Sequence, residues 1–115
     1  MDAEFEKQWQ HTLKQISLQF GEDIDIKGVL FLIGVQELGK GYKIYSKQQK
    51  TELMHVAVCA LLEEYGYYTF LGKDEDGWPH WNSTEKLPLL KPMEQEKLIK
   101  QAIILYFNKM TALVN

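Results

Sequence analysis

Arginine is absent from this chain of 115 residues, so all 13 basic side chains are lysine. Arginine supplies the planar fork of donors that grips phosphate and guanine with paired hydrogen bonds, and a lysine ammonium lacks that geometry. The lysines are scattered along the chain and are offset by 16 acidic residues, which gives a net charge of −3. We therefore expect no binding to nucleic acid.

Cysteine and long apolar runs are also scarce. Cys59 is the only cysteine, so no internal disulfide is possible, as suits a reducing compartment. No apolar stretch approaches the roughly 18 residues that a transmembrane helix needs. The first residues, 1–6, are acidic and do not have the pattern of a secretory signal. These features predict a soluble, cytoplasmic protein that binds no membrane.

What the sequence does contain is typical of one globular domain spanning residues 1–115. Hydrophobic residues make up 45% of the chain and charged residues 25%, which are ordinary values for a folded domain. No internal repeat, linker or low-complexity stretch divides it. A chain of this length can bury a core without disulfides or metals.

Two segments in the first third of the chain have the pattern of helices. Residues 2–20 repeat apolar side chains at helical spacing, and Gly21 suits the position after a helix. Residues 25–38 contain the unbroken apolar run 29–35, which fits a buried strand as well as a buried helix. Because no second run of similar strength exists to pair with it, we interpret 25–38 as a helix.

Two further helices are predicted from their start signals. Ser46 and Gln49 have the spacing of a capping box, and Gly66 marks the end of the helix that follows. Pro92 suits the first turn of a last helix that ends near Asn115.

Between these two helices, residues 67–84 change to an aromatic-rich composition. Asp76 and Gly77 lie between two aromatic runs, which is a hairpin signal. The predicted fold is therefore mainly α, a four-helix bundle-like domain with a short aromatic β-hairpin or ordered loop between its third and fourth helices.

The second and third predicted helices are apolar nearly all the way round, and such helices must be enclosed. Either the segment 67–84 covers them, or a second subunit does. We expect a homodimer, the commonest closed oligomer, with coverage inside the chain as the alternative.

Three short motifs resemble ligand sites but are incomplete. Residues 34–41 match part of a phosphate-binding loop, yet Gly41 replaces the hydroxyl residue that would ligate magnesium. Residues 74–77 resemble a calcium loop, but Ser83 stands where its bidentate glutamate belongs. Glu52 and His55 form a single Glu-x-x-His pair, whereas a di-iron site needs two.

A looser group of polar residues remains as a candidate site. His55 shares a helix face with Cys59, and Glu37 lies inside an apolar helix. Asp74, Asp76 and His80 lie in the aromatic segment. If that segment folds over the helices, Glu37, His55 and Asp76 or His80 converge, either on a divalent metal or for acid–base catalysis. The alternative is polar groups that satisfy one another by hydrogen bonds, with no cofactor at all, and Cys59 packed as a small hydrophobe.

The sequence Trp78-Pro79-His80-Trp81 is the most unusual local pattern. Its tryptophans suit a ligand pocket or a partner contact, and they suit equally a cap over the core. The ligand-binding candidates are therefore Trp78, His80 and Trp81, together with Asp76.

The segments 35–39, 53–57 and 76–81 resemble parts of a family of small uncharacterised bacterial proteins. The likeness covers about half of the chain, from Gly28 to Trp81, and implies no activity, cofactor or catalytic residue. Whether the protein is an enzyme stays open. The first hypothesis is binding of a protein partner or small ligand through residues 67–84. The second is a metal-dependent or acid–base enzyme built on Glu37, His55, Asp76 and His80.

Overall fold

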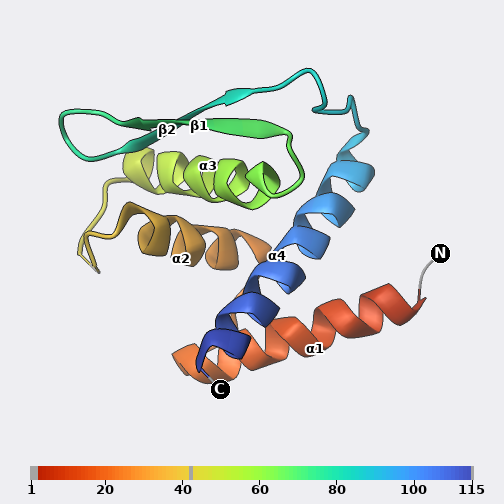
Figure 1. Cartoon of the computed structure of the whole chain (residues 1–115). Helices are drawn as coiled ribbons and strands as arrows, with labels where there is room; N and C mark the ends of the chain where they lie inside the picture. The colour runs from red at the N-terminus through yellow and green to blue at the C-terminus, as the bar shows by residue number, and fades with distance from the viewer. Residues whose placement is uncertain (1–2, 42, 115) are drawn as a thin grey trace.

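A computed structural model describes residues 3–41 and 43–114 of the chain. Its elements are, in order, α1 (Ala3–Phe20), α2 (Ile26–Leu38), α3 (Lys47–Glu63), β1 (Tyr68–Lys73), β2 (Pro79–Ser83) and α4 (Pro92–Val114). The predictions of a mainly helical chain and of a hairpin between the third and fourth helices are confirmed (Figure 1). The apolar run 29–35 is helical, as its lack of a strand partner indicated.

Side-chain and backbone caps explain where α2 and α3 begin and end. The Asp25 carboxylate accepts a hydrogen bond of 2.9 Å from the Gly28 N–H, which satisfies a free donor in the first turn of α2. Gly39 ends α2 in the left-handed conformation, with φ of 74°. At the start of α3, Ser46 and Gln49 form the predicted capping box in both directions.

Helices α2 and α3 approach each other closely at Gly34. A Cβ atom added to Gly34 would lie 2.1 Å from the Leu53 carbonyl oxygen, so only glycine allows the two backbones to approach this far. Leu53 itself is fully buried. The two helices therefore pack as a unit, with one apolar cluster of Val35, Leu38, Tyr45 and Leu53.

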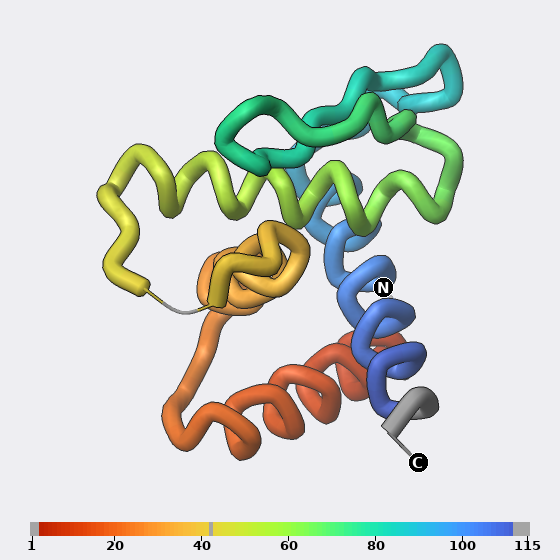
Figure 2. The backbone as a smooth tube through the Cα atoms, turned by 60° about the vertical axis from the view of Figure 1, so that its left-hand side comes forward, coloured from red at the N-terminus to blue at the C-terminus, as the bar shows by residue number. Residues whose placement is uncertain are grey.

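The hairpin lies along α3 on the side away from α2 (Figures 1 and 2). Phe70 pairs with Trp81 across the strands, and the register shifts by one residue at Leu71. The Trp81 indole N–H donates a hydrogen bond of 2.7 Å to the Glu63 carboxylate at the end of α3. At the other end of the hairpin, Trp78 packs on the cluster around Leu53. The hairpin thus covers much of the apolar surface that α3 would otherwise expose.

Helix α4 runs from the hairpin end of the molecule down to α1, and crosses α3 on the way (Figures 1 and 2). The larger apolar cluster lies among all four helices. Its buried members include Trp9 from α1, Val29 from α2, Leu61 from α3 and Ile103 from α4. The four helices point in different directions, so a four-helix bundle is not confirmed. Among the described residues, none of the helices combines the length and apolar character needed to cross a membrane.

Candidate functional site

A cavity of about 570 Å³ lies between the first half of α3 and the turn of the hairpin. We call it the hairpin cavity. Three of the four residues that the sequence suggested for ligand binding line it, namely Asp76, Trp78 and His80, together with His55 from α3. The complete lining is Gln49, Thr51, Glu52, His55, Val56, Asp74, Asp76, Trp78, Pro79 and His80.

Buried residues support the walls of the hairpin cavity. Val56 and Pro79 are buried, and the Trp78 ring packs on the apolar cluster that contains Leu53. The backbone is set by α3 on one side and by the paired strands on the other. The two histidines therefore approach the same space from two separately fixed elements.

Asp74 organises the turn of the hairpin. Its Oδ1 accepts hydrogen bonds from the Asp76 N–H at 2.9 Å and from the Trp78 N–H at 3.0 Å. Its Oδ2 lies 2.8 Å from Nε2 of His80. A single carboxylate thus fixes both the path of residues 74–78 and the orientation of the His80 ring.

The same contacts determine the protonation of Asp74. The hydrogen bond with His80, followed by that from the Trp78 N–H, lowers the pKa of the Asp74 carboxyl below its ordinary value. The side chains of His80 and Asp74 are 57% and 41% exposed, so water screens the pair and it contributes little to stability. The main effect of the pair is geometric. Asp74 is hydrogen-bonded to Nε2 of the His80 ring, so Nδ1 is the ring nitrogen that remains for another contact.

Cys59 contacts His55 but is not one of the residues that line the cavity. Its Sγ is 3.5 Å from Nε2 of His55, and its side chain is buried. Burial raises the pKa of the Cys59 thiol to about 11, so the thiolate required of a nucleophile is scarce at neutral pH. Cys59 therefore behaves as the packed small hydrophobe that its apolar neighbours indicated.

Glu37 is not among the residues that line the hairpin cavity. It lies half-buried on α2, with the Tyr106 hydroxyl of α4 as a hydrogen-bond partner. Burial raises the pKa of the Glu37 carboxyl, and the negative charge of Glu63 raises it further, against the hydrogen bond from Tyr106. Of Glu37, His55, Asp76 and His80, the last three line the same cavity and Glu37 does not.

Trp81 also lies outside the cavity, because its position in β2 directs it to Glu63 and to the Phe70 ring, whose centroid is 5.3 Å away. Conversely, Glu52 and Asp74 line the cavity although neither was among the candidate catalytic, ligand-binding or metal residues. Both were visible in the sequence, Glu52 in its Glu-x-x-His pair with His55 and Asp74 in the acidic run before Gly77. Only the fold showed that those two local motifs face one another.

The chemistry of the cavity lining is that of carboxylates and imidazoles. Among residues 3–41 and 43–114, no group of three or more His, Cys, Asp or Glu side chains is arranged to hold a metal ion. A divalent metal stays an alternative to the expectation of no cofactor. Of its candidate ligands His55, His80, Asp76 and Glu37, the first three line the cavity.

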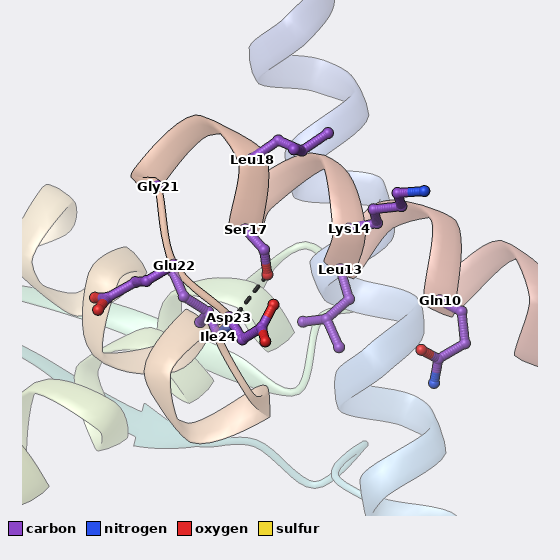
Figure 3. Close-up of a pocket in the computed structure, with 9 residues that line it drawn as sticks. All are labelled: Gln10, Leu13, Lys14, Ser17, Leu18, Gly21, Glu22, Asp23 and Ile24. Carbon is purple, nitrogen blue, oxygen red and sulfur yellow. Dashed lines mark hydrogen bonds between the residues drawn. The ribbon is translucent and has the colours of Figure 1, made fainter.

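A larger hollow, of about 780 Å³, lies at the end of α1 beside the turn into α2 (Figure 3). It is lined by Leu13, Lys14, Ser17 and their neighbours, and by none of the residues that the sequence suggested for a site. The Ser17 hydroxyl accepts a hydrogen bond of 3.1 Å from the Ile24 N–H, so this side chain serves the turn between the helices.

No protein family, curated protein or solved structure matches this chain. The resemblance of residues 28–81 to small bacterial proteins stays a prediction.

Proposed function

We propose that this protein binds a small polar ligand in the hairpin cavity. The observation that carries the proposal is that Asp76, Trp78 and His80 line the same hollow as His55. His55 comes from α3 and the other three come from the hairpin, the element that follows α3 in the chain. A polar group on such a ligand would meet side chains from both elements at once.

The size of the hairpin cavity and the packing behind its wall support this function. Its volume of about 570 Å³ lies in the range of small-molecule sites. The Trp78 ring and Pro79 give it an apolar wall, and the cluster behind Trp78 keeps that wall in place. A preformed wall lowers the cost of ordering side chains when a ligand binds.

The test is a screen of small polar fragments against the isotope-labelled full chain, followed by nuclear magnetic resonance. Shifts confined to the lining residues of the hairpin cavity are expected. His80→Ala should lower the affinity about tenfold or more, since it removes a hydrogen-bonding group from the wall. His11→Ala is the matched control, because His11 lies on α1 outside the cavity. Shifts confined to the hollow at the end of α1 would contradict the proposal, as would a screen without hits.

A second candidate is an acid–base or metal-dependent enzyme that uses His80 and His55. The contact of 2.8 Å between Asp74 and Nε2 of His80 favours it, since a carboxylate that orients one ring nitrogen leaves the other for a substrate proton or a metal. Long-range nitrogen correlation spectra read the His80 tautomer directly. The proton is expected on Nε2 in neutral His80, and a proton on Nδ1 would count against this candidate. Elemental analysis of the purified protein tests the metal.

A homodimer, and a protein partner in place of a small ligand, belong to the same proposal. Phe70 and Leu71 are adjacent on the hairpin and are 45% and 59% exposed, so they offer an apolar surface for a contact with another chain.

A further inference from the structure

We infer that the ligand of the hairpin cavity is a small organic cation, such as an amine. This inference rests on the proposed function, because it requires the cavity to be a binding site. It concerns the charge and the chemical class of the ligand.

The charged side chains that line the hairpin cavity are of one sign. Glu52, Asp74 and Asp76 contribute carboxylates, and no lysine is among the ten lining residues. On a convex surface such groups would simply be hydrated. Here they surround a hollow of about 570 Å³ with an aromatic wall, in which a bound molecule displaces water and interacts with several of them at once.

The three carboxylates are not equivalent. Asp74 uses its oxygens for the Asp76 and Trp78 N–H groups and for His80, so it positions the turn. The Glu52 carboxylate has a single long hydrogen bond, 3.4 Å, from the Gln48 amide. Within the described residues, no hydrogen bond or ion pair involves the Asp76 carboxylate. Glu52 and Asp76 are therefore the groups left to pair with a ligand, one from α3 and one from the hairpin turn.

Trp78 is the aromatic residue among those that line the cavity, and an aromatic neighbour suits an organic cation better than a bare ion. An ammonium over an indole face is attracted by the negative face of the ring, and the alkyl or aryl part of an amine packs on the same surface. An anion would meet both that negative face and the two carboxylates. The arrangement thus favours a cation with an apolar part.

The hairpin turn already holds an ammonium group of the chain itself. Lys40, which follows α2, donates a hydrogen bond through Nζ to the Asp76 carbonyl oxygen and lies against Gly77. Lys40 is not a lining residue of the cavity. The turn therefore binds one ammonium from the chain itself. The carboxylates that line the cavity have no lysine among the other lining residues.

The experiment compares two probes that share a phenyl ring and differ in charge, 2-phenylethylamine and 3-phenylpropanoate, each titrated into the labelled full chain near neutral pH. The amine is expected to shift the resonances of Glu52, Asp76 and the Trp78 indole, and the carboxylate is not. Glu52→Gln and Asp76→Asn, made singly, should each weaken amine binding about tenfold, as expected for the loss of one nearby charge. Glu75→Gln is the matched control, because Glu75 belongs to the same turn and does not line the cavity.

Binding of 3-phenylpropanoate as tight as that of the amine would overturn the cation inference and leave the cavity as a binding site. So would an equal loss of amine affinity in Glu75→Gln, which would show a diffuse charge effect. Tighter binding of zinc than of the amine at the same resonances would replace the organic cation by a metal. If the fragment screen finds other cavity ligands and the amine shifts nothing there, the inference alone fails. If no fragment binds there, the proposed function fails with it.

Discussion

Glu37 shows at the scale of single residues what burial does to a charge. It lies half-buried on α2 beside Tyr106, and burial raises the pKa of its carboxyl above the ordinary 4.5. The folded state then holds the proton more tightly than the unfolded chain does. The contribution of Glu37 to stability is therefore largest below the ordinary pKa and is lost as the pH rises through the raised value.

Replacing Glu37 by glutamine should consequently raise the melting temperature at neutral pH, because the neutral amide avoids the cost of burying a charge and still accepts a hydrogen bond from Tyr106. The gain should shrink as the pH falls below about 4.5, where the wild-type carboxyl also becomes neutral. Thermal unfolding followed by circular dichroism across this range measures both. Glu75→Gln, at an exposed position, is the control. A lower melting temperature for Glu37→Gln at neutral pH would show that the hydrogen bond from Tyr106 to the charged form outweighs burial.

At the scale of elements, the packing of α2 on α3 depends on Gly34. An alanine Cβ at this position would lie 2.1 Å from the Leu53 carbonyl oxygen, a backbone atom that cannot move without its helix. The two helices would have to separate, and Leu53 would lose part of its complete burial.

We expect Gly34→Ala to lower the free energy of unfolding by at least about 1–3 kcal/mol, the usual cost of overpacking a core. Urea denaturation measures the difference. Gly28→Ala is the comparison within α2, since its new Cβ would meet side-chain atoms, the first of them Cγ2 of Ile24 at 2.7 Å, and no backbone atom of another helix. Its cost should therefore be smaller, and alanine favours a helix by up to about 1 kcal/mol over glycine. Equal stability of Gly34→Ala and the wild type would mean that α2 and α3 are not packed this closely.

At the scale of the whole molecule, the hairpin decides how much apolar surface is left for another chain. It covers α3 on the side away from α2, and Trp78 closes the cluster around Leu53. The excess of apolar surface that suggested a homodimer is therefore smaller than the sequence alone indicated. Large apolar side chains still exposed include Leu18, Phe70, Leu71, Leu89 and Met93.

The homodimer stays a prediction with a direct test. Size-exclusion chromatography with light scattering should give twice the chain mass of 13.5 kDa. The double variant Phe70→Ser, Leu71→Ser should shift the population to monomer if the outer face of the hairpin forms the contact. Leu18→Ser is the control, because it makes the same kind of change at an exposed leucine on α1. A single-chain mass at high protein concentration would contradict the dimer.

Local rules were enough to place the elements along the chain. The capping box of Ser46 and Gln49, the start at Asp25 and the turn signal of Asp76 and Gly77 each act over a few residues, so the sequence alone indicated the helix starts and the hairpin. The site was predicted only in part, because spacing tells which side chains share a face of one helix and not which helix faces which.

Tertiary structure therefore decided the rest. The hairpin lies along α3, which brings Asp76 and His80 to His55 and adds Glu52 and Asp74 to the same cavity. The crossing of α4 over the other helices gives Glu37 the partner Tyr106 in place of the histidines. The physical reason is the same in both cases. The way one element packs on another depends on long-range contacts, such as the approach of Gly34 to Leu53, which no local pattern encodes.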